Sequence, residues 1–252
     1  MTRALLLAIA VALLPAAPAS AKGKPQPGPT GSSPVIRSRA REGTARGGRL
    51  VIMRHGESTA NRSGRFAGRR NVRLTRKGRA QAARAGRSLR GIHFDRAYSS
   101  ELDRASSTLR LALEAASQPA TPRVKSGALN ERRYGVLEGR RRSAAERTYG
   151  AERLRRWRLS WSEGPPGGES LADVSGRAVD FLDGQVMADL AAGKNVLIAS
   201  HKHTIRALVG HLEGLSPAEL EKLDVSNAEP IVYRLGRDGR LRREKPAHRR
   251  GR

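Results

Sequence analysis

The sequence contains no cysteine among its 252 residues. This absence excludes disulfides, thiolate zinc sites, iron–sulfur clusters and cysteine nucleophiles. Acidic residues are also scarce, because the chain has 23 Asp and Glu but 49 Lys and Arg, which gives a formal net charge of +26. Arginine is spread through nearly every segment, so the charge indicates a compositional bias first and a polyanion-binding surface second.

Long apolar runs are absent beyond the N-terminus. There, Ala4–Leu14 is an uninterrupted apolar run of 11 residues that follows Arg3 and precedes the small-residue pattern Ala19-Ser20-Ala21. The run is shorter than the roughly 20 residues that a membrane-spanning helix needs. We therefore expect residues 1–21 to be a signal peptide, with an exported mature chain that has no membrane span. If the start codon is misassigned, the protein is instead cytoplasmic.

Composition divides the rest of the chain into three parts. Residues 22–48 are rich in Pro, Gly, Ser and basic residues and predict a flexible linker, because such a segment buries too little apolar surface to order itself. Residues 240–252 predict a basic frayed tail. The ordered body is expected over 49–239, which is long enough for one α/β domain.

Within this body, apolar runs of strand length alternate with helical patterns. Strands are predicted at 50–53, 94–99, 195–200 and 231–233, the last as an edge strand, and helices at 75–90, 104–116, 143–157, from 170, at 204–212 and from 216. Ser143-x-x-Glu146 and Ser170-x-x-Asp173 are expected to cap two of these helices. The alternation predicts an α/β fold, a three-layer α/β/α sandwich with a mainly parallel central sheet.

Two histidines directly follow predicted strands. Arg54-His55-Gly56 comes after the first strand, and His201 follows Ser200 at the end of the clearest buried strand. In an open α/β sheet, ligands bind at the carboxyl ends of the strands, so both histidines are candidate site residues. Gly56 is expected to allow a sharp turn and to leave backbone amides available to an anion.

Two further segments contribute candidates. Arg104 follows Ser99-Ser100-Glu101 at a predicted strand-to-helix junction, which would place it near the same sheet edge. From its position alone, Arg104 could equally be a solvent-exposed arginine like many others in this chain. Glu131 lies in LNERRYG, where it could pair with a nearby arginine or serve as a carboxyl group that moves protons.

Taken in order, RHGES, SSELDRA, LNERRYG, PPGGES and SHKHTIRAL resemble the motifs of the histidine phosphatase superfamily. The LNERRYG-LEG block and the final EPIVY are most similar to its cofactor-dependent phosphoglycerate mutase branch. The resemblance covers nearly all of residues 49–235 and implies a phosphoglycerate mutase-like fold.

The resemblance also implies residue roles. His55 would be the nucleophile that becomes phosphohistidine, Glu131 the proton donor and acceptor, and Arg54, Arg104 and His201 the groups around the transferred phosphoryl. The substrate-contacting positions would be Ser58, Asn61, Gly68, Arg132, Tyr134, Arg142 and Arg158, with Lys202 and His203 beside them.

Physical chemistry is consistent with these roles. Phosphoryl transfer depends on positioning and on cations around the equatorial oxygens, and the planar guanidinium suits phosphate. His55 must attack as the neutral imidazole, so we expect a backbone carbonyl to accept the proton of its other ring nitrogen. No metal is required, and the sequence shows no obvious metal-ligand cluster.

Three features depart from the mutase pattern. His201-Lys202-His203 stands where the family usually has His-Gly-Asn or His-Gly-Gly, and Lys202 could add a cation or obstruct the site. Leu159 follows Trp157-Arg158 where mutases have a second arginine. The insertion that many mutases carry before the ESL segment is replaced by a short Gly-Pro-rich stretch at 164–170.

Two enzymatic functions follow from the resemblance. The first is a 2,3-bisphosphoglycerate-dependent mutase that interconverts 2- and 3-phosphoglycerate, the chemistry of glycolysis and gluconeogenesis, with 2,3-bisphosphoglycerate as phosphoryl primer. The alternative is an exported phosphatase that hydrolyses small phosphomonoesters through the same phosphohistidine. A lesser alternative is an inactive binder of phosphate ligands or polyanions. A small phosphorylated substrate is the expected partner, without specific nucleic-acid binding, and a homo-oligomer remains open.

Overall fold

The computed structural model describes residues 47–244. The predicted signal peptide, nearly all of the predicted linker and residues 245–252 of the predicted tail lie outside the described residues. No helix among residues 47–244 is both long enough and apolar enough to cross a bilayer.

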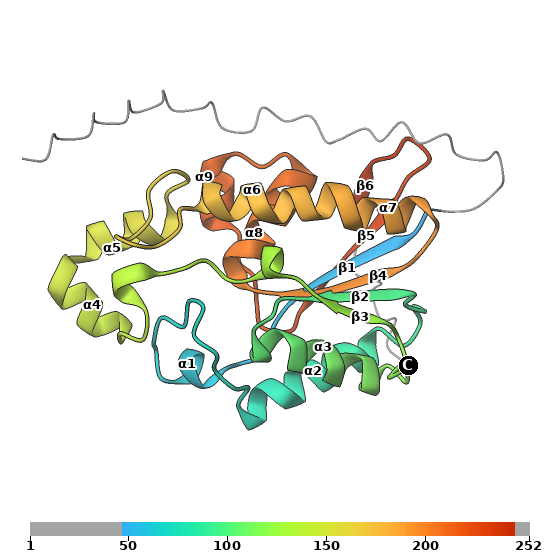
Figure 1. The fold of residues 1–252 in the computed structure, drawn as a ribbon, viewed down its shortest axis with the longest axis horizontal. Helices are drawn as coiled ribbons and strands as arrows, with labels where there is room; N and C mark the ends of the chain where they lie inside the picture. Colours follow the sequence, from blue (N-terminus) through green and yellow to red (C-terminus); the bar gives the residue numbers. More distant parts are fainter. Residues whose placement is uncertain (1–46, 245–252) are drawn as a thin grey trace, which may run out of the picture.

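A six-stranded sheet forms the centre of the fold (Figure 1). In chain order the strands are β1 (Arg49–Arg54), β2 (Arg96–Ser99), β3 (Arg123–Lys125), β4 (Val196–Ser200), β5 (Pro230–Leu235) and β6 (Leu241–Arg243). Their order in space is β3-β2-β4-β1-β5-β6. Three of the five pairings are parallel, and β5 alone runs against the other strands. The mainly parallel α/β sandwich predicted from the sequence is confirmed.

The C-terminal part of the sheet differs from the expectation. Residues 231–233 were expected to form an edge strand, but β5 lies between β1 and β6. The predicted tail begins at 240, yet Leu241–Arg243 pairs with β5, and Leu241 packs into the core. A tight turn joins β5 to β6, and in it the Gly236 amide donates to the Arg240 carbonyl at 2.9 Å.

Helices cover both faces of the sheet (Figure 1). One face carries α2 (Arg76–Ser88) and α3 (Asp103–Ala115). The other carries α6 (Leu171–Phe181), its π-helical continuation Leu182–Val186, α7 (Met187–Ala191) and α8 (Lys202–Glu213), with α9 (Pro217–Lys222) packed on α8. The shorter α1 (Thr59–Arg62), α4 (Arg142–Tyr149) and α5 (Ala151–Leu159) complete the helices of residues 47–244. Two 3₁₀ turns, Gly127–Leu129 and Gly135–Leu137, join β3 to α4.

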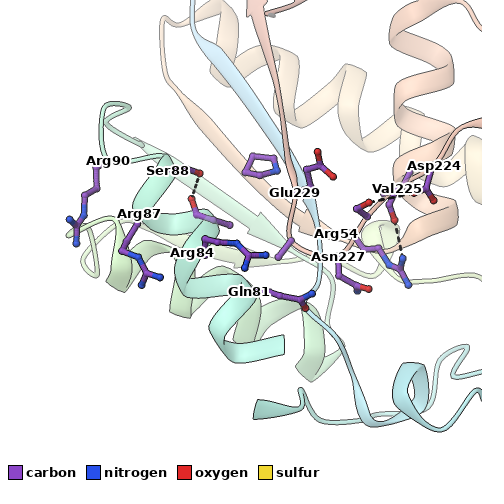
Figure 2. A pocket seen from close by; sticks show the side chains of 14 residues that line it. Arg54, Gln81, Arg84, Arg87, Ser88, Arg90, Asp224, Val225, Asn227 and Glu229 are labelled. Carbon is purple, nitrogen blue, oxygen red and sulfur yellow. Dashed lines mark hydrogen bonds between the residues drawn. The ribbon is translucent and has the colours of Figure 1, made fainter. Parts of the chain in front are cut away.

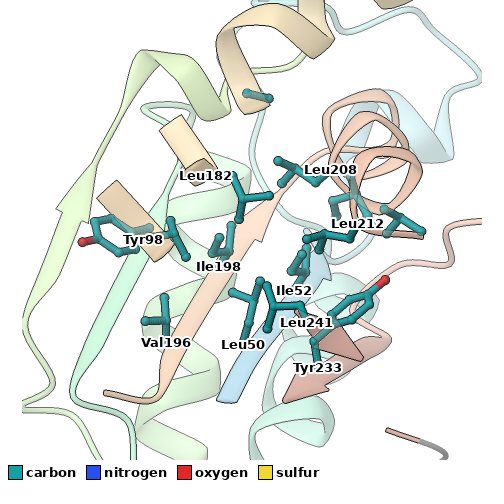
Figure 3. Packing of buried hydrophobic residues seen from close by; sticks show 14 of the residues in the cluster. Leu50, Ile52, Tyr98, Leu182, Val196, Ile198, Leu208, Leu212, Tyr233 and Leu241 are labelled. Atoms are coloured by element: carbon teal, nitrogen blue, oxygen red, sulfur yellow. The ribbon is translucent and has the colours of Figure 1, made fainter. Parts of the chain in front are cut away.

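Alternate residues of the central strands pack into different layers. Leu50 and Ile52 of β1 belong to the cluster under α6–α8, whereas Val51 and Met53 belong to the cluster under α2 and α3. Figure 3 shows the first cluster around Leu182, Ile198 and Leu208. Because successive side chains of a strand point to opposite faces, a fully apolar strand is buried on both sides.

Helix capping follows the sequence in one predicted case and not in the other. Ser170 accepts the Asp173 amide and Asp173 accepts the Ser170 amide, as a capping box requires. The predicted box at Ser143 is wrong, because α4 starts one residue earlier, at Arg142, without a side-chain cap. The single helix predicted over 143–157 is interrupted at Gly150, whose φ of +80° suits glycine and ends α4 before α5 begins.

Close packing of α2 on α3 depends on Gly86. A Cβ at this position would lie 2.0 Å from the Ala112 carbonyl oxygen of α3. We expect Gly86→Ala to lower the free energy of unfolding by about 1–3 kcal/mol, as overpacking does. The matched change Gly176→Ala in α6 has open space around it and should raise stability by about 0.5–1 kcal/mol. Urea unfolding of both variants checks the pair, and equal effects would contradict the packing argument.

Candidate active site

The carboxyl ends of three neighbouring strands meet at one edge of the sheet. Arg54 at the end of β1 pairs in register with Ser200 of β4, and Ser99 of β2 pairs with Ala199. The residues that follow each strand, His55, Ser100 and His201, therefore lie together although they are far apart in the chain.

His55 is buried and held by backbone groups on both sides. Its amide donates to the Ser200 carbonyl at 2.9 Å. Its Nδ1 is 2.7 Å from the Gly56 carbonyl oxygen, which can only accept, so Nδ1 carries the ring proton and Nε2 presents a lone pair. Burial lowers the pKa of His55 well below its usual value, and Arg104 and Arg54 lower it further. The ring is therefore a neutral imidazole near pH 7, as phosphoryl attack requires.

The second histidine is also fully buried. The His201 ring lies 5.1 Å from the His55 ring between centroids, and its Nε2 is 2.7 Å from the Ser100 hydroxyl. That hydroxyl already accepts the Leu102 amide, which leaves its own proton available to His201. Burial, Arg104 and His55 lower the pKa of His201 well below its usual value, so this ring is neutral too.

Two buried guanidiniums stand beside the histidines. Arg54 donates from Nη1 to the Val225 carbonyl at 2.9 Å. Arg104, in the first turn of α3, donates to the Gly68 and Arg70 carbonyls at 2.8 and 3.0 Å. Burial lowers the pKa of Arg104 to about 10, which leaves it charged at neutral pH. Arg104 therefore serves both as a cation in the site and as an anchor for the loop at 68–70.

Three polar atoms around this site have no hydrogen-bond partner among the described residues. They are Nε of Arg54, Nε of Arg104 and Nδ1 of His201. An unpaired buried polar group costs about 1–3 kcal/mol, and each of the guanidinium atoms is a donor. Donors on fixed cations match the oxygens of a bound phosphoryl group.

A carboxylate completes the cluster. Glu131 is buried, and its Oε1 accepts the Arg132 amide at 3.0 Å. Burial alone would raise the pKa of Glu131, but the hydrogen bonds that its carboxylate accepts from the His203 ring and from the Arg132 amide outweigh it and hold that pKa well below its usual range. Without a bound anion, Glu131 is a carboxylate.

Many of the sequence-predicted residues line one pocket. These are Arg54, His55, Ser58, Asn61, Gly68, Arg104, Glu131, Tyr134 and Arg142. Ser58 and Asn61 also form the capping box of α1, which fixes both side chains within the pocket lining. Segments separated by more than 80 residues thus line one pocket.

Five predicted residues are not among those that line this pocket. The His201 ring lies beside the ring of His55, which does line the pocket. His203 lies against Glu131 and Tyr134. Arg132 is fully buried, and its Nη1 and Nη2 donate to the backbone carbonyls of Arg158 and Glu169 and so hold the loops together, while its Nε has no partner among the described residues.

Lys202 and Arg158 also differ from the expectation. Lys202 forms an ion pair with Asp224 at 3.1 Å and begins α8 in place of a glycine. It therefore neither obstructs the lining of the pocket nor adds a cation to it. Arg158, near the end of α5, contributes a carbonyl to Arg132 but no side chain to the pocket lining.

Gly56 acts differently from the sequence expectation. Its amide is not available to an anion, because it donates to the Thr108 hydroxyl at 3.0 Å. Glycine is needed there because a Cβ would lie 2.2 Å from the Gly78 carbonyl oxygen. The residue lets α2 approach the end of β1.

Sequence reasoning missed several residues of the site. Ser100 orients His201, Thr108 holds the loop after His55, and Arg65 and Phe66 line the pocket. Glu169 is buried and binds both Arg69 and Arg177. Ser100 and Glu169 fall inside quoted motifs, so the signal for them was present, whereas nothing local distinguishes Arg65 or Thr108.

A broader groove lies on the other side of Arg54. It runs between α2 and the segment 224–230, and Figure 2 shows Arg84, Arg87 and Arg90 along one wall. Asp224 and Glu229 lie on the opposite wall, so the groove has mixed charge. Within residues 47–244, no cluster of three or more His, Asp or Glu side chains has the arrangement to hold a metal ion.

The buried histidines make stability depend on pH. Because the pKa values of His55, His201 and His203 are lowered on folding, the unfolded chain binds protons first as the pH falls. We expect the free energy of unfolding to fall below about pH 6.5, by up to about 1.4 kcal/mol per pH unit for each histidine. Urea unfolding at pH 7.5 and 5.5 measures the slope. His203→Gln should make it shallower, and an unchanged slope would contradict the assignment.

Comparisons with known proteins agree with this geometry. The family model described as "Histidine phosphatase superfamily (branch 1)" matches residues 50–244. A 2,3-bisphosphoglycerate-dependent phosphoglycerate mutase 2 of Gloeobacter violaceus is 43% identical over 190 residues, which cover 75% of this chain and 87% of that protein.

Solved structures give the same fold. A phosphoglycerate mutase from Bacillus anthracis superposes with a TM-score of 0.67 at 28% identity, covering 81% of this chain and 94% of that one. A mycobacterial glucosyl-3-phosphoglycerate phosphatase complexed with VO3 superposes with a TM-score of 0.66 at 28% identity, covering 80% and 98%. Both mutases and phosphatases are thus similar to this chain.

Proposed function

Because the chain belongs to branch 1 of the histidine phosphatase superfamily, we propose that it is a 2,3-bisphosphoglycerate-dependent phosphoglycerate mutase that interconverts 2- and 3-phosphoglycerate. The observation that carries the proposal is the His55 ring, whose Nδ1 is held by the Gly56 carbonyl so that Nε2 presents its lone pair, in a pocket that Arg54 and Arg104 line and beside the His201 ring. The mutase names of relatives about 40% identical support the substrate class.

His55 is the proposed nucleophile. Its Nε2 lone pair forms a bond to phosphorus while the bond from phosphorus to the ester oxygen breaks. Arg54 and Arg104 neutralise the charge on the equatorial oxygens, and the carbonyl of Gly56 stabilises the ring as it becomes positive. Because these groups are fixed before the reaction, little reorganisation is needed in the transition state.

Glu131 is the proposed general acid and base. It protonates the departing ester oxygen and then takes the proton of the hydroxyl that attacks the phosphohistidine. Glu131 starts as a carboxylate, and a bound phosphate dianion raises its pKa, because a nearby negative charge disfavours the ionised form. Substrate binding therefore favours protonation of the acid that the first transfer needs.

The pocket residues also fit the priming cofactor. When bound, 2,3-bisphosphoglycerate supplies the phosphoryl group that loads His55. Arg54 and Arg104 would hold the phosphate at the nucleophile, and Arg142 with Arg65 would hold the distal anionic groups. The unpaired donors near His55 are the structural feature that fits such a polyanion.

The second candidate function is hydrolysis of small phosphomonoesters through the same intermediate. Leu159 stands where mutases have a second arginine, and Arg132 is committed to backbone carbonyls, so the distal end of the site has fewer free cations. A weakly held product would leave before it re-docks, and water would then take the phosphoryl group.

One paired assay decides between the two functions. Interconversion of 2- and 3-phosphoglycerate that depends on added 2,3-bisphosphoglycerate is expected. Release of inorganic phosphate from phosphoglycerates or a generic phosphomonoester, without isomerisation, would replace the mutase proposal by the phosphatase. Absence of both activities and of an acid-labile phosphoenzyme would leave the non-catalytic binder.

Export is proposed from the N-terminal sequence. The mature protein would begin at Lys22, after the pattern Ala19-Ser20-Ala21. N-terminal sequencing of the protein from culture supernatant or periplasm checks this. Intact Met1 on protein recovered only from the cytoplasm would overturn it.

A further inference from the structure

His203 lies against the proposed acid–base carboxylate. Its side chain is 7% exposed, and it follows Lys202 in the first turn of α8. The Nδ1 atom is 3.4 Å from Oε1 of Glu131 and 3.2 Å from the Tyr134 hydroxyl. Glu131 and Tyr134 line the pocket, whereas His203 is not one of the lining residues.

One nitrogen thus has two partners of different kinds. A neutral imidazole nitrogen is either a donor or an acceptor. With its proton on Nδ1, His203 donates to the Glu131 carboxylate. With its proton on Nε2, the bare Nδ1 accepts from the Tyr134 hydroxyl and from a protonated Glu131. Each tautomer therefore suits one protonation state of the carboxyl group.

We infer that His203 is a positioning residue that relays protons between solvent and Glu131. Nε2 takes a proton from a hydronium ion while Nδ1 gives its proton to a Glu131 oxygen, and the Nε2–H tautomer remains. The reverse transfer returns a proton to water. No other reactant is consumed, and the inference rests on the proposed acid–base role of Glu131.

The surrounding charges keep the relay in its working state. The groups near His203 are Glu131, Tyr134, Arg132 and Arg206. Burial lowers the pKa of His203, the two arginines lower it further and Glu131 opposes them, so the ring is neutral at pH 7. Burial and Glu131 raise the pKa of Tyr134 to about 12, so its hydroxyl stays a donor.

The relay would supply the proton that Glu131 gives to the departing ester oxygen. Glu131 is a carboxylate in the free site but must carry a proton before the first ester bond breaks. A substrate that fills the pocket would cover the carboxyl group on that side, because Glu131 is part of the pocket lining. His203 offers a second route, because Nδ1 contacts Glu131 while Nε2 has no hydrogen-bond partner among residues 47–244 and is not fully buried.

The test compares His203→Gln and His203→Ala with His211→Gln in the purified full chain. Glutamine hydrogen-bonds but does not relay protons, so kcat should fall about tenfold or more while KM and Tm change little. Added imidazole should restore much of kcat to His203→Ala, and the solvent deuterium effect on kcat should grow in His203→Gln. His211, on the same helix, pairs with Asp183 at 3.2 Å, and its variant should match the wild type.

The outcomes separate the relay from the proposed function. Wild-type kcat in His203→Gln at every pH, or a loss that imidazole does not restore, overturns the relay. Phosphoenzyme formation on His55 is measured in the same variants. Its presence upholds the phosphohistidine chemistry even where the relay fails, and its absence in the wild-type chain overturns both.

Discussion

Replacing His55 by alanine is expected to abolish turnover, with a loss of kcat on the order of 10⁴-fold or more. The ring supplies the only nucleophilic nitrogen in the pocket lining, and its Nε2 is presented by the hydrogen bond from Nδ1 to the Gly56 carbonyl. Isomerase and phosphatase rates should fall together, because both functions use one intermediate. Steady-state assays with phosphoglycerates and a generic phosphomonoester measure the change.

The phosphoenzyme provides the direct readout. Wild-type protein should acquire an acid-labile, alkali-stable phosphoryl group from labelled 2,3-bisphosphoglycerate, and His55→Ala should acquire none. His93→Ala is the matched control, because that side chain is 80% exposed and does not line the pocket. Labelling that persists in His55→Ala would place the nucleophile elsewhere.

Arg104→Lys should reduce kcat by about 10²- to 10³-fold although it conserves the charge. The guanidinium binds the carbonyls of Gly68 and Arg70 and also faces the site, and an ammonium cannot make all of these contacts in the same plane. The loop at 68–70 loses its anchor, so KM for the phosphorylated substrate should rise as well. Steady-state kinetics over a range of substrate concentrations separates the two effects.

Arg110→Lys is the matched control on the same helix. Arg110 is half-exposed and pairs with Glu114 one turn away at 2.7 Å, and such surface pairs contribute little to stability or function. Its kinetic constants should equal those of the wild type. Equal, small losses in both variants would mean that the buried Arg104 guanidinium contributes nothing specific to phosphoryl transfer.

Local sequence patterns located the central strand β1 and one of the two predicted helix caps. The four-residue run at 50–53 predicted a strand correctly, since each of its residues is buried in one layer or the other. Ser170-x-x-Asp173 forms the box that it predicts, whereas Ser143-x-x-Glu146 does not. The same local pattern failed in the second case because α4 already begins at Arg142, which places Ser143 inside the helix.

Strand order and the end of the domain were beyond such reasoning. Residues 231–233 have the composition of an edge strand, but the turn at 236–240 lets a further strand pair with β5. Pairing between strands is a long-range contact. A short polar strand such as β6 has too few residues to show the apolar alternation that would predict it. The boundary predicted at 239 therefore fell short of Leu241–Arg243.

The amino-acid sequence alone determined which residues stand at the ends of buried strands. Apolar runs of strand length and the residues that follow them are local properties, so His55 and His201 could be named before any coordinates, whereas the role of Arg104 came from the family resemblance. The tertiary structure alone decided what each side chain meets. Whether Lys202 enters the site or pairs with Asp224, and whether His203 contacts substrate or Glu131, depends on which distant segments pack together. Those contacts are set by the packing of whole layers, and no spacing within the chain encodes them.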